Sequence, residues 1–492
     1  MHRRERQGPV DGKRLTELFE AADTLGDAVP DVRVTGIAYR SGDVRPGDAF
    51  FCVPGFRHDG HEFAGDAVAR GATALVCSRQ LPVDAPQVLV CDVRRALALG
   101  SARFYDHPST ELEVIGITGT NGKTTTTYLL ESILRAAGRV PGLIGTVETR
   151  VAGERLPSSH TTPESADLQR LFRNMKEAGV DSVAMEVSSH AIDLRRVDAT
   201  RFAVAAFTNL TQDHLDFHHT LEEYWSVKRR LFTELDVGAR VVNVDDPRGA
   251  ELALETDAPL TVGRSGAATV RATGERRTGF ATTFTLVTPA GSSTVTLPLT
   301  GAYNVSNALV AAGSALALEV DLRAIVSGLE TAPQVPGRLE RIDEGQPFGV
   351  FVDYAHTPDS LAQAIAAVRA VTPGRVITVF GCGGDRDPEK RPMMGAAAGL
   401  GSDEVVLTSD NPRSEDPIGI ILHVEDGLRP TGTSYTVEVD RRTGIARALG
   451  LAAPGDSILI AGKGHEDYQI FADRTVHFDD REVAREELRS LC

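Results

Sequence analysis

The stretch from residue 112 to residue 128, LEVIGITGTNGKTTTTY, constrains the fold of this chain most. Apolar residues between Leu112 and Ile117 predict a short buried strand, and residues 124–137 are compatible with a helix. A glycine loop therefore joins a strand to a helix. Because such a loop points backbone N–H groups at its ligand, at the positive end of the helix dipole, the stretch predicts a site for a nucleoside triphosphate.

The loop differs in one position from the strict phosphate-loop pattern. That pattern would place a glycine at position 117, where this chain has Ile117, so the match is to the shorter form GTNGK[ST]. We expect Lys123 to add a positive charge beside the phosphates and the Thr124 hydroxyl to ligate Mg²⁺. The loop residues predicted to bind the nucleoside triphosphate are Gly119, Thr120, Asn121, Gly122, Lys123, Thr124 and Thr125.

Length, charge and cysteine usage limit the other classes of function. A chain of 492 residues should form about three domains. Its net charge of −16, without a tract dense in Lys or Arg, argues against nucleic acid or an anionic membrane as a partner. The cysteines show no CxxC or His-paired spacing, which fits reduced thiols. They are Cys52, Cys77, Cys91, Cys382 and Cys492.

The N-terminal segment MHRRERQGPVDGKR is basic but lacks the apolar stretch of a secretory signal. No run of about 18 apolar residues, the length needed to span a bilayer, occurs in the chain. We therefore expect a cytoplasmic protein.

Three segments have the patterns of separate α/β domains, and we place them at residues 1–110, 111–333 and 334–492. In the first, short β-like runs alternate with helix-compatible segments. The second continues with the strand-like runs VAMEV and AVAAF, a β-rich stretch with turns expected at ERRTG and PAGSS, and a helix candidate at residues 301–319. The linker TAPQVPGRLE contains two prolines and a glycine and predicts a hinge into the third segment.

The third segment has a regular βα period. FGVFVDYA, RVITVFG, DEVVLTSD and SILIAGKG predict strands, with helices after the first three and a final amphipathic helix from Asp480. In an open parallel sheet, ligands bind at the carboxyl ends of the strands. The motifs DYAHTPD, GCGGDRD, SDNPR and GKGHEDY all fall at such ends, so we predict a ligand site there.

Two residues of the second segment have the chemistry of Mg²⁺ ligands. Glu186 follows an apolar strand, and His214 lies in the loop after another. By spacing alone, Lys228 is one of three adjacent cations and would be exposed.

The motifs named above are spread over essentially the whole chain. Further motifs between them are TTP, MEVSSHA, GAYNVSN and PGRLE. In this order they resemble those of the Mur ligase family, and within it the MurE-type members that add diaminopimelate. The resemblance implies an α/β fold with a small N-terminal UDP-binding domain, a central P-loop ATPase domain and a C-terminal Rossmann-like domain. The chain departs from the family at Arg40 and Gly42, where Asp and Arg are usual, and at Glu389, where Gly is usual.

The resemblance also implies roles for individual residues. Those that would hold the UDP-linked substrate are Ser41, Thr161, Thr162, Ser188 and Arg196. Those that would hold ATP together with the loop are Asn307, Arg338, Asp353 and His356. Those that would hold the incoming amino acid are Tyr354, Arg386, Asp410, Asn411, Arg413, Gly462 and Glu466.

A catalytic and metal-binding set follows from the same resemblance. The residues that would hold Mg²⁺ are Thr124, Glu186, His214 and Lys228. The catalytic residues would be Lys123, Glu186, His214 and Lys228. Lys228 matches a lysine that these ligases carry as a carbamate, N6-carboxylysine. The added carboxylate would turn a cation into the oxygen ligand that Mg²⁺ prefers.

The activity implied is ATP- and Mg²⁺-dependent addition of diaminopimelate to UDP-N-acetylmuramoyl-L-alanyl-D-glutamate through an acyl phosphate, in peptidoglycan synthesis. Arg413 would bind the distal carboxylate of diaminopimelate, which lysine lacks, and Glu466 the distal ammonium. The residues do not decide between the meso and LL isomers. We expect a monomer whose partners are these small molecules.

Three alternatives stay open at the level of sequence. A lysine-adding relative would share most of these motifs. A folylpolyglutamate synthase has a related ATP domain but usually lacks a separate N-terminal domain, whereas residues 1–110 precede the loop here. A non-catalytic binding protein of the same fold would not need the lysines, yet Lys123 and Lys228 are both present.

Overall fold

The computed structural model describes residues 12–26, 29–56, 58–156 and 160–491. Most of the basic N-terminal segment, two serines before the TTP motif and Cys492 lie outside these ranges. The chain forms two compact units. The first is Met1–Gly116, Arg139–Ala205 and Val227–Ala239, and the second is Ile117–Gly138, Ala206–Ser226 and Arg240–Cys492.

The first unit contains a small sheet of parallel strands in the order β3-β4-β5-β6. Successive residues of each strand point to opposite faces. Phe50 packs with the apolar residues of helix α2, while Phe51 packs with those of helix α3, so both faces are covered. The elements are β3 (Gly36–Ala38), β4 (Asp48–Phe51), α2 (Ala64–Ala69), β5 (Ala74–Cys77), β6 (Gln87–Leu89) and α3 (Val93–Phe104).

Short elements complete this part of the chain. Strands β1 and β2 form an antiparallel pair. The bounds are β1 (Lys13–Arg14), α1 (Leu15–Leu18), η1 (Ala21–Asp23), β2 (Arg33–Val34), η2 (Ser41–Asp43), η3 (Gly60–Phe63) and η4 (Pro108–Thr110).

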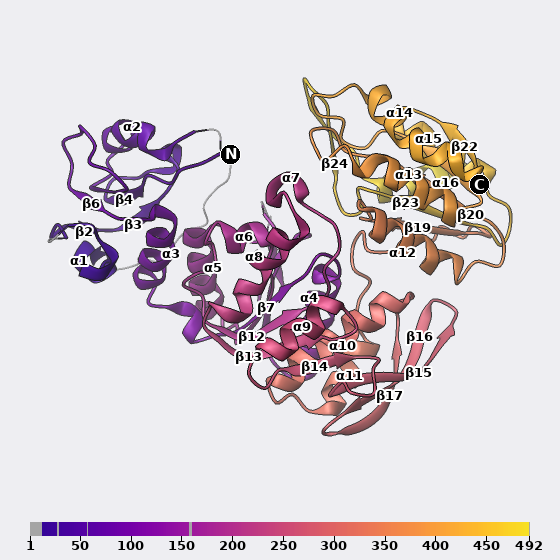
Figure 1. Cartoon of the computed structure of the whole chain (residues 1–492), viewed down its shortest axis with the longest axis horizontal. Coiled ribbons are helices and arrows are strands. Elements are labelled where there is room, and N and C mark those ends of the chain that lie inside the picture. Colours follow the sequence, from indigo (N-terminus) through magenta and orange to yellow (C-terminus); the bar gives the residue numbers. More distant parts are fainter. Residues whose placement is uncertain (1–11, 27–28, 57, 157–159, 492) are drawn as a thin grey trace. The chain divides into compact units, whose positions relative to one another are not determined.

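In the described part of the chain, the largest sheet has eleven strands in the order β10-β9-β8-β11-β7-β12-β13-β14-β15-β16-β17. The boundary between the two units falls within β7, β12 and β13. These three strands are neighbours in the sheet (Figure 1). The first nine strands in sequence order are β7 (Glu113–Thr118), β8 (Pro141–Ile144), β9 (Thr149–Val151), β10 (Glu154–Leu156), β11 (Ser182–Glu186), β12 (Phe202–Phe207), β13 (Val237–Asn243), β14 (Leu260–Gly263) and β15 (Val270–Thr278). The strand predicted before the glycine loop is β7, in the middle of this sheet.

The last strands of this sheet form an antiparallel meander of β15, β16 (Ala281–Thr288) and β17 (Gly291–Leu297). The turn predicted at ERRTG is wrong for its first four residues, which belong to β15. The polar sequence favours a turn, but pairing with β16 resumes after an irregularity between Thr273 and Arg276 and carries the strand to Thr278. The chain turns instead at Gly279.

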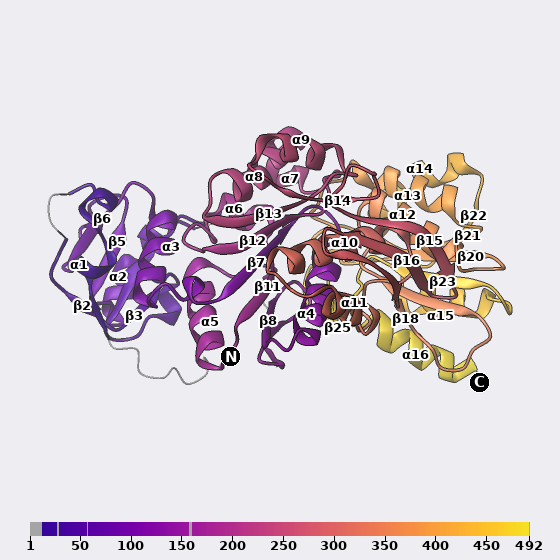
Figure 2. The same ribbon diagram turned by 90° about the horizontal axis from the view of Figure 1, so that it is seen from below.

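The helix after the glycine loop is α4 (Lys123–Ala136), as predicted, and it lies beside α10 (Ala302–Ala317) and α11 (Leu322–Glu330) (Figure 2). Close approach of α11 requires Gly328, because a Cβ atom there would overlap the backbone of Ile133. The remaining helices of this region are α5 (Ser165–Glu177), α6 (Ser189–Asp193), α7 (Leu215–His218), α8 (Leu221–Thr233) and α9 (Pro247–Glu255).

A second parallel sheet has the order β18-β19-β23-β20-β21-β22, in which only β18 is antiparallel to its neighbour. Because β19, β20, β21 and β23 are parallel, the loops after these four strands meet at one edge of the sheet. In this sheet β23 comes last in sequence but lies between β19 and β20. The strands are β18 (Glu340–Arg341), β19 (Gly349–Asp353), β20 (Val376–Phe380), β21 (Glu404–Leu407), β22 (Ser434–Val437) and β23 (Ser457–Ala461).

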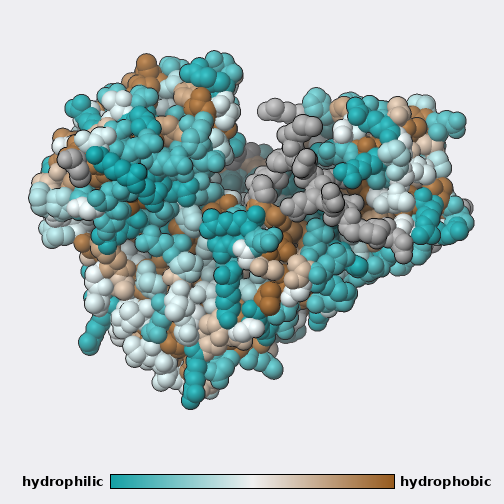
Figure 3. Space-filling model, turned by 180° about the vertical axis from the view of Figure 1, so that it is seen from behind, coloured by the Kyte–Doolittle hydropathy of each residue, from teal (hydrophilic) through white to brown (hydrophobic). Residues whose placement is uncertain are grey.

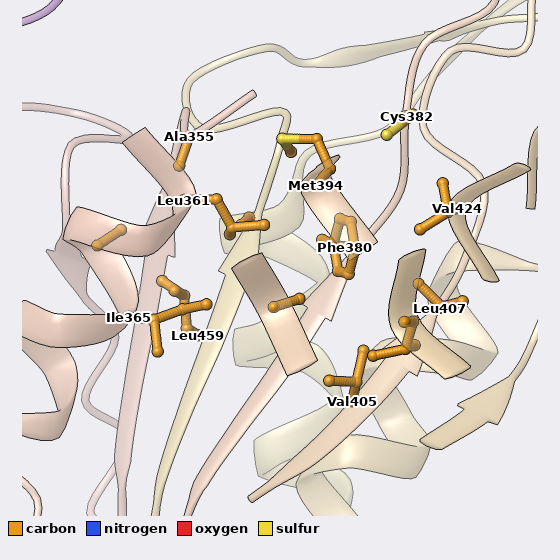
Figure 4. Close-up of a cluster of buried hydrophobic side chains, with 14 of the residues drawn as sticks. Ala355, Leu361, Ile365, Phe380, Cys382, Met394, Val405, Leu407, Val424 and Leu459 are labelled. Carbon is orange, nitrogen blue, oxygen red and sulfur yellow. The ribbon is translucent and has the colours of Figure 1, made fainter. Parts of the chain in front are cut away.

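Helices cover both faces of this sheet. Leu459 and Phe380 point to the face covered by α12, α13 and α14 (Figure 4), whereas the neighbouring Ile460 points to the face covered by α15 and α16. The predicted βα repeat is therefore confirmed, with β22 and α15 as additions that were not predicted. The remaining elements are α12 (Pro358–Arg369), α13 (Lys390–Gly401), α14 (Pro417–Leu428), η5 (Arg429–Thr431), α15 (Arg441–Leu451), β24 (Tyr468–Ile470), β25 (Thr475–His477) and α16 (Asp480–Leu491).

The face of the molecule in Figure 3 is mostly hydrophilic, with apolar residues in small groups. None of the helices in the described ranges combines the length and apolar character needed to cross a bilayer. The four described cysteines are free, and Cys52, Cys77 and Cys382 are buried.

Candidate functional site

The glycine loop after β7 has two positions that require glycine. Gly119 and Gly122 have φ angles of 146° and 86°, a region that side chains other than glycine rarely adopt. A Cβ atom at Gly119 would overlap the Thr208 hydroxyl, and one at Gly122 would overlap the Asn307 side chain. The loop therefore packs tightly before it enters α4.

Residues of the segment that follows β12 form hydrogen bonds with this loop and fix its conformation. This role was not predicted from the sequence. Thr208 Oγ1 donates to Asn121 O at 2.7 Å, and Asn209 Oδ1 accepts from Asn121 N at 2.9 Å. Asn209 O accepts from Thr120 N at 2.8 Å. The loop leads directly into the first turn of α4, and the N–H groups at the start of a helix suit an anion.

Lys123 and Thr124 begin α4 beside residues from the start of the second parallel sheet. Lys123 Nζ donates to Gly119 O at 2.9 Å and to Thr120 O at 2.7 Å. Thr124 Oγ1 accepts from Arg338 Nη2 at 3.1 Å, and the Arg338 guanidinium lies 4.4 Å from the centre of the Tyr354 ring. The second unit thus brings the loop together with Arg338, one of the residues predicted to bind ATP.

Asp353, the last residue of β19, and His356, which follows the strand, were also predicted to bind ATP. The Asp353 carboxylate accepts from Leu339 N at 2.6 Å and from Ala355 N at 2.8 Å. Burial raises the pKa of Asp353 to about 6, outweighing a neighbouring positive charge and these hydrogen bonds. His356 Nδ1 lies 2.8 Å from Tyr354 O, and burial lowers the pKa of His356.

Asp213 lies beside His214 and His356, two residues that were predicted for the site, but it was not itself predicted. Its Oδ2 atom is 3.4 Å from His214 Nε2 and 3.9 Å from His356 Nε2. Burial alone would raise the pKa of Asp213, but the charges of His214, His356, Lys390 and Lys123 outweigh burial and hold it at about 2. Asp213 therefore stays ionised.

A cavity of about 300 Å³ lies in the second unit where β19, β20, β21 and β23 end. All residues predicted to bind the amino acid line it, namely Tyr354, Arg386, Asp410, Asn411, Arg413, Gly462 and Glu466. Its lining also includes Asp213, Cys382, Lys390 and Tyr468, which were not predicted.

The cavity presents both signs of charge. Asp410 and Glu466 form what we call the acidic wall. Arg413 adopts a left-handed backbone conformation with φ of 53°, and its Nη1 atom donates to Gly384 O at 2.6 Å. Two guanidinium groups, the Lys390 ammonium and four carboxylates line this one small cavity, a mixture that suits a zwitterionic ligand such as an amino acid.

In the first unit, Glu186 ends β11 with a side chain that is only 1% exposed. Its two carboxylate oxygens accept from Thr146 N at 2.8 Å and from Thr146 Oγ1 at 3.0 Å. The Thr146 hydroxyl also lies 3.0 Å from Thr161 Oγ1. Each carboxylate oxygen accepts one of these bonds and keeps a further lone pair, which suits a cation.

Three more of the residues predicted to bind the UDP-linked substrate lie around Glu186. Thr162 Oγ1 donates to Glu186 O at 2.8 Å and accepts from Ser188 N at 3.1 Å. Arg196 Nη1 donates to Thr162 O at 3.1 Å. The fifth predicted residue, Ser41, lies in η2 of the small N-terminal sheet.

Arg196 and Arg94 both lie against the carboxylate of Glu164. Arg94 was not predicted from the sequence. Glu164 Oε2 lies 3.5 Å from Arg196 Nε and 3.3 Å from Arg94 Nη1. Two guanidinium groups against one carboxylate leave a net positive charge beside Thr162. This charge suits an anionic ligand.

The predicted metal set has members in both units, with Glu186 and Lys228 in the first and Thr124 and His214 in the second. Lys228, in α8, is 1% exposed, so the spacing-based expectation of an exposed cation is wrong. The chain here is helical, and this position faces inward. Among the described residues, no group of three or more His, Cys, Asp or Glu side chains could hold a metal ion. Of the four predicted ligands, only Glu186 and His214 are of these residue types.

Three family models match the chain in the order of its segments. They are the Mur ligase family catalytic domain at residues 33–107, the Mur ligase middle domain at residues 117–315 and the Mur ligase glutamate ligase domain at residues 337–464. These matches support the predicted order of three α/β domains.

Individual relatives extend the likeness to nearly the whole chain. The UDP-N-acetylmuramoyl-L-alanyl-D-glutamate--2,6-diaminopimelate ligase of Bacillus licheniformis is 45% identical over 487 residues, 97% of this chain and 99% of the relative. The enzyme of the same name from Geobacillus kaustophilus is 48% identical over 452 residues, 90% of this chain and 92% of the relative. A solved structure of a ligase with this name is 31% identical, has a TM-score of 0.69 and covers 98% of this chain and 99% of its own. The chain belongs to the Mur ligase family.

Proposed function

We propose that the protein is an ATP-dependent ligase that adds diaminopimelate to UDP-N-acetylmuramoyl-L-alanyl-D-glutamate in peptidoglycan synthesis. The observation that carries this proposal is the cavity that joins the acidic wall to Arg413, in the same unit as the loop Gly119–Lys123. Relatives that are 45% and 48% identical bear the name of this reaction.

ATP binds at the glycine loop, where the N–H groups of the first turn of α4 and the Lys123 ammonium receive the phosphates. Arg338, 3.1 Å from Thr124, adds a second positive charge. The Thr124 hydroxyl and the His214 imidazole in the second unit, and the Glu186 carboxylate in the first, each have the donor chemistry of a Mg²⁺ ligand. Bound Mg²⁺ would neutralise oxygens on the phosphoryl donor and acceptor.

The reaction has two steps. The terminal carboxylate of the UDP-linked substrate attacks the γ-phosphorus of ATP, which gives an acyl phosphate and ADP. Lys123 stabilises the charge on the transferring phosphoryl group. The neutral amine of the amino acid then attacks the acyl carbon, the C–O bond to phosphate breaks, and the nitrogen gives up one proton, which leaves the amide and HPO₄²⁻.

The cavity selects the amino acid by its distal end. The guanidinium of Arg413 forms two parallel hydrogen bonds with the distal carboxylate of diaminopimelate, and Glu466 pairs with the distal ammonium. Lysine offers the ammonium but no carboxylate. It would leave a guanidinium without its partner in a small cavity, which is costly.

The UDP-linked substrate binds in the first unit, at Thr161, Thr162, Ser188 and Arg196, with Ser41 from the small sheet. The excess positive charge of Arg196 and Arg94 over Glu164 supports this assignment. We also infer that Lys228 carries a carbamate, for which its burial is the support. The net charge of −16 is consistent with a cytoplasmic monomer whose partners are small molecules.

The test is ADP release with UDP-N-acetylmuramoyl-L-alanyl-D-glutamate and a panel of amino acids. Wild type should turn over diaminopimelate with a kcat/KM about 10² to 10³ times that for lysine, the ratio expected for a charge left unpaired. Arg413→Ala should lose most of this ratio through a higher KM for diaminopimelate. Arg474→Ala, which changes an exposed arginine paired with Asp473, is the matched control and should keep the ratio.

Other outcomes separate the alternatives. Equal use of lysine would overturn the specificity and leave the ligase activity standing. Glutamate addition to a folate would indicate a folylpolyglutamate synthase, and absence of ADP release with every amino acid would indicate a binding protein.

A further inference from the structure

Lys463 lies directly behind the acidic wall of the cavity. It follows β23 within the GKG turn, and its side chain has no solvent exposure. Its Nζ atom is 3.1 Å from Asn411 Oδ1, 3.4 Å from Glu466 Oε2 and 3.9 Å from Asp410 Oδ1. One ammonium thus contacts three polar residues that line the cavity, and it lies 5.6 Å from the ring centre of a fourth lining residue, Tyr468, without lining the cavity itself.

The contact with Asn411 fixes the orientation of that amide. Asn411 Oδ1 accepts from both Lys463 Nζ and Ile470 N, the latter at 3.0 Å. The amide nitrogen therefore turns to Glu466, where Nδ2 donates to Oε2 at 2.9 Å. An ammonium can only donate, so it excludes the flipped amide. Lys463 and the Ile470 N–H together determine which edge of Asn411 meets Glu466.

Lys463 also sets the charge of the acidic wall. Burial, and after it the nearby Asp410 carboxylate, raise the pKa of Glu466, while Lys463 and the Asn411 hydrogen bond oppose this rise. One buried ammonium beside two carboxylates leaves a net charge of one negative unit. That charge matches a single ammonium group of a ligand.

We propose that Lys463 is a positioning and specificity-determining residue, whose buried ammonium holds Asp410, Asn411 and Glu466 in one arrangement and tunes the acidic wall to one ammonium group of the incoming amino acid. The inference rests on the proposed function only in that it places an amino acid in this cavity. Because Nζ is sealed from solvent, Lys463 acts through these three side chains and does not touch the substrate.

Other ionisable groups surround Glu466 from every element packed on it. Tyr354 and Tyr468 flank it, and the Glu466 charge contributes to raising the pKa of each hydroxyl. Arg413 lies across the cavity, and the buried Arg441 lies behind the strand ends. These groups remain in a Lys463 variant, so the ratio of variant to wild-type KM isolates the effect of Lys463.

Loss of the ammonium has a definite pH signature. Without Lys463, Glu466 takes up a proton at higher pH than in wild type, because the Asn411 hydrogen bond that remains offsets less of the effect of burial and the Asp410 charge. As pH falls, the wall of the variant loses negative charge that the wild-type wall keeps. The KM ratio for the amino acid must therefore rise as pH falls.

The experiment measures the KM for diaminopimelate from pH 7 to pH 9 in wild type, Lys463→Met, Lys463→Arg and the control Lys176→Met, a lysine paired with Glu111 outside the second unit. For Lys463→Met we expect a KM about tenfold above wild type at pH 7 that falls to within about threefold at pH 9. Lys463→Arg keeps the charge in a larger group, so its KM should rise by a factor independent of pH. The KM values for ATP and for the UDP-linked substrate should stay within about twofold.

A KM ratio for Lys463→Met that is constant from pH 7 to pH 9, or that stays within twofold of one, would overturn the proposal. If Lys463→Met does not fold, Lys463→Gln, uncharged but still a donor, carries the same test. Failure of the proposed function shows separately, as wild type that does not use diaminopimelate. The pH series then uses whichever amino acid wild type does use.

Discussion

Arg441 and Asp480 form a two-bond ion pair, with both hydrogen bonds at 2.7 Å and both side chains fully buried. The same guanidinium donates to Ser409 O at 3.4 Å and to Ala461 O at 3.0 Å. These carbonyls immediately precede Asp410 and Gly462 in the cavity lining. The pair therefore joins α15 and α16 to the two strand ends that carry the acidic wall.

Breaking this pair should destabilise the fold strongly. Arg441→Met leaves Asp480 buried without its partner, which should lower the free energy of unfolding by about 3–5 kcal/mol. The adjacent Arg442, whose exposed side chain pairs with Glu486 and Glu487, is the matched control. Arg442→Met should cost less than about 1 kcal/mol. Urea unfolding of both variants measures the difference, and equal effects would contradict the role given to the buried pair.

Removal of the Lys123 ammonium should abolish ligation. Lys123→Ala leaves the loop without the charge that accompanies the transferring phosphoryl group, so ADP release should fall by at least about 10³-fold. Binding of the UDP-linked substrate, measured by calorimetry, should stay near wild type because its predicted residues lie in the first unit. Ligation within tenfold of wild type would reject the assignment of this loop.

Lys228 should carry a carbamate in active protein. Lys228 is buried, and reaction of a lysine amine with CO₂ would give an oxygen ligand for Mg²⁺. Carbon-13 NMR after incubation with labelled bicarbonate should show one carbamate signal that disappears in Lys228→Met and remains in Lys176→Met. Fully active protein without that signal would disprove the modification.

Asp353 should make stability depend on pH in a known direction. Its pKa of about 6 is above the ordinary value of 3.8, so the folded protein binds this proton more readily than the unfolded chain. The resulting stability is present below about pH 4 and is lost as pH rises through about 6. Asp353→Asn has no carboxyl proton to bind, so its free energy of unfolding relative to wild type should increase by about 2 kcal/mol from pH 4 to pH 7. Asp343→Asn, at an exposed carboxylate, should show no such trend.

The sequence predicted the strand, loop and helix around Lys123 and the βα repeat after residue 334, because apolar periodicity and glycine positions specify both. It did not predict β22, which is short and partly exposed, or α15, which contains two glycines and lacks a clear apolar face. Tertiary pairing decided these elements, as it did the extension of β15 through ERRT.

The candidate site was predicted through its motifs but not through its supporting residues. Gly462 and Glu466 were identified, yet Lys463 between them was not, because spacing does not reveal which side chain points into the sheet. Asp213 and Arg94 were missed for a related reason. Their partners, His356 and Glu164, are more than 60 residues away in sequence, and only the fold brings each pair together.

The buried thiol in the cavity wall bears on the design of covalent probes. Burial raises the pKa of Cys382 to about 12, so at neutral pH it holds almost none of the thiolate that attacks electrophiles. Cys91 is the exposed cysteine among the four described. An alkylating reagent should therefore modify Cys91 and spare Cys382, which allows a fluorescent dye to be attached to the small N-terminal sheet while the amino-acid cavity stays chemically intact.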